Sequence, residues 1–330
     1  MAQQHPDVQH PAGAAPALTA YLRAQATDFL RAQTGSAGGG PAQGGDSAPA
    51  LRRAARRIGA TLHTFHAAFD PAWSAGLRRE LAWFSGALAQ ERLHAATLRR
   101  LQAALQEPPG DLGAARAAAL LERRLTLARG RAHSAVLEAL GSARFHALAD
   151  AVALLGGEVP LRGDAAACAV LREQAGTAEV RLADAVAALP AGPGPDADPA
   201  TDPDPGPYGD ALPYGDAGPC QGRPGDGDGD PAWHQVRLLL RLHRYAVEAL
   251  GGPVPPRLVA AARALDRHRD AAEAASVAAA AARTPRIAPA TAYALGNLHA
   301  HQRHEVLAAR HAFHRTWQSL PRPRNTVTVP

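Results

Sequence analysis

Four cationic or titratable side chains lie on one face of the segment 231–250. In a helix that turns 100° per residue, His234, Arg237, Arg241 and Arg244 occupy a stripe about 80° wide. Large aliphatic side chains fall on the opposite side, where they would face a core. Arginines stacked a turn apart repel one another, and the guanidinium fork matches the oxygens of a phosphate group. The stripe predicts an oxyanion-binding face, with an ordinary solvated helix surface as the alternative.

The segment 50–69 repeats this arrangement in the first half of the chain. Arg52, Arg56 and His63 share one face of the expected helix, and the opposite face is lined by Leu51, Ile58, Leu62, Phe65 and Phe69. The position equivalent to His234 is occupied by Pro49. We therefore expect the complete stripe in 231–250 to contribute more binding energy than the incomplete one.

Most catalytic chemistries are poorly supported by the composition. All 35 basic Lys+Arg residues are arginine, which excludes a P-loop lysine and a Schiff-base lysine. The two cysteines, Cys168 and Cys220, form no C-x-x-C motif. No G-x-S-x-G or G-x-G-x-x-G motif occurs. We expect a protein that is not an enzyme and that needs no cofactor.

Two segments resemble metal sites, but neither fits. The segment 226–230 reads DGDGD like the start of a calcium loop, yet Pro231 and Arg237 stand where such a loop needs Gly and Glu. The last helical segment carries several histidines, but Ala308 breaks a possible H-E-x-x-H pattern that begins at His304. We predict no metal site, and we expect His304, Arg303 and Arg310 to border the anion-binding surface instead. His243 falls on the apolar face of its helix and is interpreted as a core residue.

The charge is distributed unevenly along the chain. The formal net charge is +5, yet the acidic segment 190–230 holds nine aspartates and one arginine and so carries −8. The remainder therefore carries +13, which favours a polyanionic ligand. Because Pro, Gly and Asp dominate the acidic segment, we expect it to be disordered. It could cross the basic surface and compete with the ligand.

Helical periodicity dominates the rest of the chain, and no convincing strand pattern appears. No apolar run approaches the length of a membrane span, and the N-terminus has no secretion signal, so a cytoplasmic protein is expected. A glycine-rich loop is expected at 35–49. Helices are expected at 16–33, 50–69, 75–106, 114–140, 142–155, 165–189, 231–250, 256–282 and 288–319.

The segment W-H-Q-V-R-L-L-L-R-L-H-R-Y at 233–245 resembles the signature helix of the CHAD family, the conserved histidine α-helical domain. The matching residues are His234, Arg237, Arg241, Arg244 and Tyr245. In the first half, 51–65 is similar through Arg52, Arg56 and Arg57, although Pro49 and Gly59 replace a family histidine and arginine. Further similar segments contain Arg92 with Leu93 where the family has an acid, Asp270 as the corresponding acid of the second half, SARF at 142–145, and 296–317.

The resemblance implies an all-α fold of two four-helix bundles with pseudo-twofold symmetry. We expect a disordered N-terminus at 1–15, a first bundle at 16–160, a second at 161–320 containing the acidic segment, and a tail at 321–330. It also implies binding of inorganic polyphosphate, location on polyphosphate granules and association with a CYTH-type triphosphatase. Site residues are expected to be His234, Arg237, Arg241, Arg244, Arg52, Arg56, His63, Arg92, Arg99 and Arg303.

The sequence is compatible with two other functions. One is a scaffold or protein-interaction module of polyphosphate metabolism whose phosphate site is eroded, since the first-half stripe is incomplete. The other is nonspecific binding of nucleic acid, although no aromatic platform or base-reading motif supports it. We expect no specific nucleic-acid partner and no membrane partner.

Overall fold

The computed structural model describes residues 13–38, 44–106, 112–163, 167–190 and 230–318. The predictions for the acidic segment, Cys220 and the tail at 321–330 concern residues outside these ranges. So does most of the predicted N-terminal segment 1–15.

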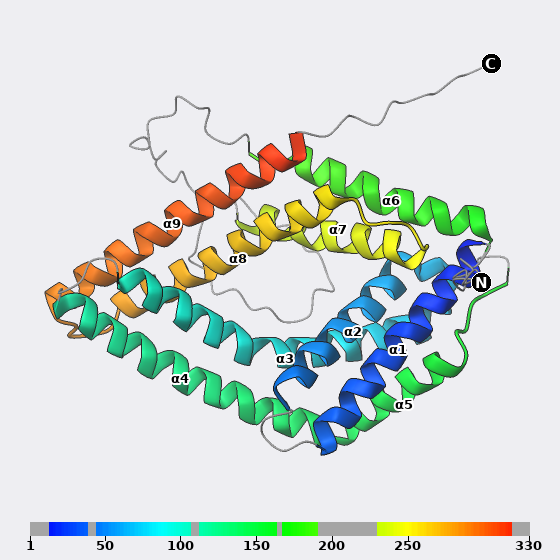
Figure 1. The fold of residues 1–330 in the computed structure, drawn as a ribbon, viewed down its shortest axis with the longest axis horizontal. Helices are drawn as coiled ribbons and strands as arrows, with labels where there is room; N and C mark the ends of the chain where they lie inside the picture. The colour runs from blue at the N-terminus through cyan, green and yellow to red at the C-terminus, as the bar shows by residue number, and fades with distance from the viewer. Residues whose placement is uncertain (1–12, 39–43, 107–111, 164–166, 191–229, 319–330) are drawn as a thin grey trace, which may run out of the picture.

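Within the described ranges all regular secondary structure is helical, with no strand, which confirms the all-α prediction (Figure 1). A single 3₁₀ turn at His66–Ala68 follows α2. The helices are α1 Ala14–Gly38, α2 Gly44–Thr64, α3 Pro71–Leu105, α4 Leu112–Leu140, α5 Ala143–Gly157, α6 Cys168–Ala187, α7 Asp230–Ala249, α8 Pro256–Ala282 and α9 Pro289–Gln318.

Local sequence signals explain several helix ends. The Asp70 side chain accepts a hydrogen bond of 2.8 Å from the Trp73 amide, and Pro71 occupies the first turn of α3. Ser142 caps α5 in the same way, accepting from the Phe145 amide at 3.1 Å. Such caps satisfy amide groups that have no partner within the helix. They are readable from sequence because donor and acceptor lie three residues apart.

The loop expected at 35–49 is shorter than predicted. Helix α1 continues to Gly38, and α2 already begins at Gly44, so that Pro49 lies inside α2. Pro49 is the sixth residue of α2 and has no backbone N–H, so the helix lacks one hydrogen bond there, the one to the carbonyl four residues earlier. The sequence pattern predicted that the helix begins after Pro49, whereas the helical backbone of α2 includes Pro49.

Three hydrophobic clusters form the core of the described part. The first joins α1, α2, α3 and α5, and also includes Val136 of α4, Leu171 of α6, and Ala246 and Ala249 of α7. The second joins α6, α7 and α8 to the end of α9. The third joins the end of α3 and the start of α4 to the end of α8 and the start of α9. In Figure 1 this third cluster corresponds to the end of the molecule where the α3–α4 and α8–α9 pairs converge.

The division into bundles at 16–160 and 161–320 stays a prediction. The third cluster shows, however, that the two halves are not packed separately along their whole length, because Leu121 of the first half and Leu295 of the second belong to the same core. Many of the residues buried in α8 are alanines, which allow α8 and α9 to approach closely.

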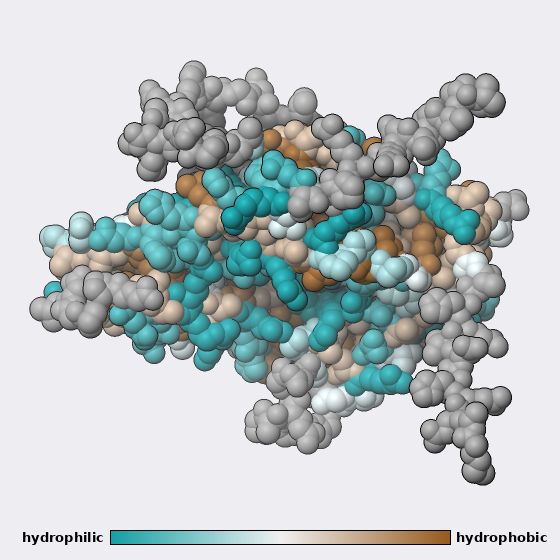
Figure 2. All heavy atoms as spheres, turned by 45° about the horizontal axis from the view of Figure 1, so that its top comes forward, coloured by the Kyte–Doolittle hydropathy of each residue, from teal (hydrophilic) through white to brown (hydrophobic). Residues whose placement is uncertain are grey.

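Large exposed apolar side chains are scattered over separate helices. Leu154 of α5 is 76% exposed and Tyr293 of α9 is 70% exposed, and neither α5 nor α9 carries a continuous apolar outer face. The face drawn in Figure 2 is largely hydrophilic, with separated hydrophobic areas. Among the described residues, no helix combines the length and hydropathy that a transmembrane span requires.

Candidate functional site

The site is built where α2 packs against α7. The apolar face of α2 is fixed in the first core cluster by Leu51, Ile58 and Leu62, all completely buried. The apolar side of α7 is fixed in the second cluster by Val236 and Leu240. Because each helix is held by its apolar side, the arginine sides of the two helices are brought together.

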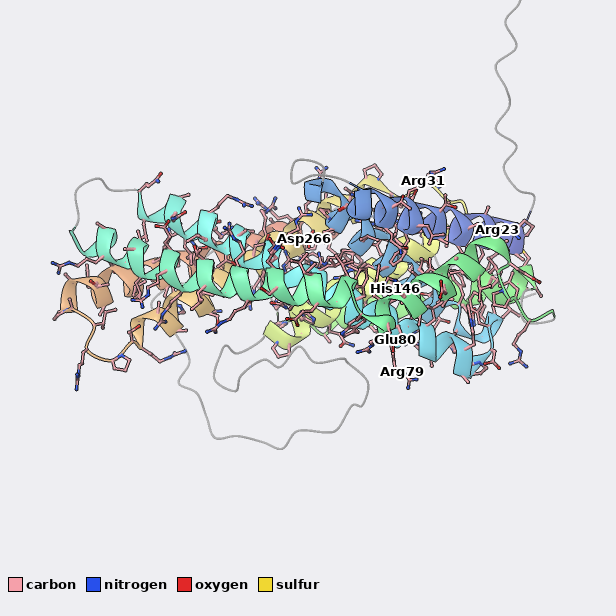
Figure 3. The ribbon with its side chains drawn as sticks, turned by 90° about the horizontal axis from the view of Figure 1, so that it is seen from below. Arg23, Arg31, Arg79, Glu80, His146 and Asp266 are labelled. Atoms are coloured by element: carbon pink, nitrogen blue, oxygen red, sulfur yellow. The ribbon has the colours of Figure 1, made fainter. Side chains whose placement is uncertain are left out.

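A pocket opens between these arginine-bearing faces, and we call it the basic pocket. Its lining comes from α2, α7 and α8 and consists of Arg56, Arg237, Leu240, Arg241, Arg244, Tyr245, Ala262 and Asp266. Asp266, labelled in Figure 3, lies near the middle of the long axis of the molecule. Four guanidinium groups from two helices therefore converge on one depression whose lining contains a single carboxylate.

Two of the pocket arginines are paired with acids. Arg237 donates from Nε and Nη2 to Oδ1 of Asp266, at 2.9 and 2.7 Å. Arg244 Nε lies 3.5 Å from Glu248 Oε1, one turn along α7. Within the described ranges, no carboxylate lies within 4 Å of the guanidinium groups of Arg56 or Arg241. The latter two can donate to an external oxyanion without first losing an internal one.

Burial and mutual repulsion disfavour the charged form of these arginines. Burial, together with the charges of Arg56 and Arg237, lowers the pKa of Arg241 to about 9. The pKa of Arg56 is lowered mainly by burial and also by Arg237 and Arg269, while Tyr245 and Asp266 act in the opposite direction. Even so, a guanidinium with a pKa of about 9 is protonated at pH 7. The basic pocket is a cluster of confined positive charges, and an anion would relieve their repulsion.

Arg52 and His234 lie beside the pocket rather than in its lining. Arg52 donates from Nε to the Ser85 carbonyl at 3.2 Å. Burial lowers its pKa to about 10, helped by the charges of Arg56, Arg269, Arg237 and Arg92. His234 is an exposed residue at the start of α7. Its pKa is lowered first by partial desolvation of the imidazole and then by the charges of Arg237, Arg241 and Arg269.

Three predicted site residues are not brought to the basic pocket. His63 lies two turns beyond Arg56 on α2, and its pKa is lowered by burial and by Arg78, His66 and Arg181. Arg99 is exposed on α3, and Arg303 lies on α9, and neither lines the pocket. Helical periodicity places residues on a face but does not say how far a neighbouring helix follows that face.

Arg92 has an intermediate position. It is exposed on α3, and it is close enough to Arg52 for its charge to lower the pKa of Arg52. Arg310, expected to border the same surface, donates from Nε to Nε2 of His268 at 3.2 Å and lies over the Trp233 ring at 5.3 Å. The Arg310 side chain therefore lies beside the N-terminal part of α7.

Sequence reasoning missed three important side chains. Asp266 and Arg269 on α8 both act on the arginine cluster, Asp266 as a partner and Arg269 as a further positive charge. Glu248 accepts a hydrogen bond from the Tyr21 hydroxyl at 3.2 Å and lies 3.3 Å from Arg57 Nη2. The sequence does contain a signal for Asp266, since Asp266 and Asp270 lie one helical turn apart with two arginines between them. The family resemblance, however, indicates only Asp270.

The predicted core position of His243 is confirmed. His243 is 8% exposed, and burial lowers its pKa. Over the described ranges, no three His, Cys, Asp or Glu side chains are grouped so that they could hold a metal ion. His299 instead has its Nδ1 3.0 Å from the Ala275 carbonyl oxygen, a contact between α8 and α9.

The arrangement is suited to binding oxyanions. Each guanidinium offers five N–H donors in a planar fork and accepts no hydrogen bond. Arginines from two crossing helices can therefore contact successive anionic groups of one extended ligand. Tyr245 adds a hydroxyl to the lining, and its ring lies below the guanidinium groups of Arg57 and Arg244 at 5.5 and 5.3 Å.

Comparison with known proteins identifies the family. PptA from Streptomyces chartreusis is 54% identical, with a TM-score of 0.77, and the match covers 93% of this chain and 100% of PptA. The CHAD domain from the plant Ricinus communis has the same fold at 20% identity, with a TM-score of 0.58. The match covers 95% of this chain and 94% of that domain. No curated protein matches the chain. The family model for the CHAD domain matches residues 20–262, well over half of the sequence. The chain belongs to the CHAD domain family.

Proposed function

We propose that this protein binds inorganic polyphosphate in the basic pocket and does so without catalysing a reaction. The observation that carries the proposal is the convergence of Arg56, Arg237, Arg241 and Arg244 in one pocket, two of them without a carboxylate partner among the described residues. The family resemblance supplies the ligand class. A polyphosphate chain carries about one negative charge per phosphate, so spaced arginines gain affinity by releasing its counterions.

The helix α7 is expected to contribute more to binding than α2. It supplies three of the four arginines in the lining, whereas α2 supplies Arg56 alone. Arg52 already donates to a backbone carbonyl. The cellular setting that goes with this function is the cytoplasm, on polyphosphate granules, with a CYTH-type triphosphatase as a partner.

The test is a titration with long-chain polyphosphate. Replacing Arg237 and Arg241 together by alanine should weaken binding about tenfold or more, since each charge-assisted contact contributes about 1.5–3 kcal/mol where water is excluded and less where it competes. The pair Arg52→Ala and Arg56→Ala should weaken it less. Arg129→Ala with Arg131→Ala is the matched control, because it removes two exposed charges from α4, away from the pocket.

Two results would point to other functions. If the Arg237/Arg241 double variant stays folded in thermal melts and binds like the parent, the phosphate site is misplaced and the scaffold function takes precedence. If duplex DNA at equal phosphate concentration binds as tightly as polyphosphate at two salt concentrations, the protein is a nonspecific polyanion binder.

A further inference from the structure

The ion pair between Arg237 and Asp266 is asymmetric in its exposure. The Arg237 side chain is 12% exposed, while the Asp266 side chain is 56% exposed. Both donor atoms of Arg237 converge on Oδ1 of Asp266. The arginine is thus fixed in the pocket lining, and the carboxylate reaches it from the solvent side of α8.

This asymmetry makes Asp266 the exchangeable partner. A carboxylate that is more than half exposed can return to water at little cost, and exposed ion pairs contribute only weakly to stability. Arg237, being mostly buried, would be left without an anion if Asp266 moved away, which is costly. The exchange is favourable only when another anion replaces the carboxylate.

The remaining pocket arginines provide a place from which such an anion could be delivered. Arg56 and Arg241 have no carboxylate within 4 Å in the described part of the chain, and they line the same pocket as Arg237. A phosphate held there would place the next phosphate of the same chain near Arg237. Linkage of this kind raises the effective concentration of the second group, an advantage that an isolated phosphate lacks.

We propose that Asp266 is an internal competitor, which occupies Arg237 in the free protein and is displaced by a phosphate of the bound chain. This inference rests on the proposed function and refines it, since it names a residue that opposes binding. Asp266 thereby favours ligands with several linked phosphates over single anions. It also offsets the repulsion within the arginine cluster while the pocket is empty, because its charge favours the charged forms of Arg56 and Arg241.

The test is a double-mutant cycle on affinity for long-chain polyphosphate. Asp266→Asn keeps the shape of the side chain but removes its charge, and it should tighten binding about fivefold, the scale of an exposed ion pair. In an Arg237→Ala background the same change should have less than about a twofold effect. Competition through Arg237 predicts this loss of effect, whereas a general electrostatic field predicts equal gains in both backgrounds.

The matched control is Asp270→Asn. Asp270 lies one turn further along α8, is 41% exposed and pairs with Arg269, whose Nε donates to it at 2.9 Å. Arg269 does not line the basic pocket. The control removes the same charge and should tighten binding by less than about twofold.

The outcomes separate the two proposals. If the parent protein does not bind polyphosphate, the proposed function fails and this inference fails with it. If the parent binds but Asp266→Asn has no larger effect than Asp270→Asn, or has an equal effect with and without Arg237, only the inference is overturned. Thermal melts of all variants verify that each is folded.

Discussion

At the scale of single residues, the exclusive use of arginine determines how the basic pocket behaves. Burial and neighbouring charges lower the pKa of Arg241 to about 9 and that of Arg52 to about 10, yet both groups are protonated at neutral pH. A buried lysine would shift its pKa readily and lose its charge. The repulsion within the cluster is therefore permanent and is available to favour the binding of an anion.

His234 should make polyphosphate binding dependent on pH. Its pKa is lowered below the usual histidine value by partial desolvation and by the charges of Arg237, Arg241 and Arg269, which favours the neutral imidazole in the free protein. A phosphate chain nearby favours the imidazolium form, so binding takes up a proton and affinity rises as the pH falls. The change should lie around and below the usual histidine pKa of about 6.5. Titrations at pH 7.5 and 5.5 should show tighter binding at the lower pH.

The control for this prediction is His63, the other histidine on the arginine-bearing faces whose pKa is lowered. His234→Asn should flatten the pH dependence, while His63→Asn should leave it intact because His63 lies among Arg78, His66 and Arg181 rather than beside the pocket. Equal flattening by both variants would contradict the assignment. The free protein should lose stability as the pH falls through the same range, because the unfolded chain binds more protons there than the folded one.

At the scale of elements, Glu248 connects three helices. It accepts from Tyr21 of α1 and pairs with Arg57 of α2 and with Arg244 of its own helix α7. The side chains of Glu248 and Arg57 are 19% and 26% exposed. Burial, then the charge of Glu248, raises the pKa of Tyr21, which keeps the hydroxyl protonated as a donor. This carboxylate holds α1 and α2 against α7 next to the basic pocket.

Replacing Glu248 by glutamine should reduce the free energy of unfolding by about 2 kcal/mol, since it leaves largely buried cations without their partner. Denaturant unfolding monitored by circular dichroism measures the loss. Glu305→Gln is the control, because Glu305 pairs with Arg100 at 3.3 Å but its side chain is 50% exposed. It should cost less than about 1 kcal/mol. Similar losses in both variants would show that Glu248 has no special role in joining the helices.

At the scale of the whole molecule, the third core cluster couples the two halves of the chain. It packs Leu101, Leu121 and Leu125 of the first half against Leu295 and Leu298 of the second. Unfolding one half would expose apolar surface of the other. The two halves should therefore unfold together rather than as independent bundles.

Leu295→Ala tests this coupling. The side chain is completely buried, and its truncation should cost about 2–5 kcal/mol while leaving one cooperative transition. Leu154→Ala, at a position that is 76% exposed, should have almost no effect. Two resolved transitions, only one of them shifted by Leu295→Ala, would show that the halves fold separately. Calorimetry and denaturant unfolding both report on this point.

The sequence by itself determined the helices and the chemical character of their faces. Hydrophobic periodicity, the caps at Asp70 and Ser142 and the proline before α8 are local signals, and the predicted helices agree with the observed ones to within a few residues at most ends. The clearest exceptions are the early start of α2, its end at Thr64 and the extension of α1 to Gly38. The same periodicity correctly placed His243 in the core and grouped Arg237, Arg241 and Arg244 on one face.

Only the tertiary structure decided which of these faces meet and what lies opposite each arginine. Arg56 joined the arginines of α7 in one pocket, whereas His63, on the same face of α2, did not. Asp266 and Glu248 emerged as partners because α8 and α1 pack beside α7. Periodicity fixes directions around one helix axis, but the crossing of two helices depends on side-chain packing between residues far apart in the sequence. That packing determines that Arg56 and Arg241 lack a carboxylate partner among the described residues.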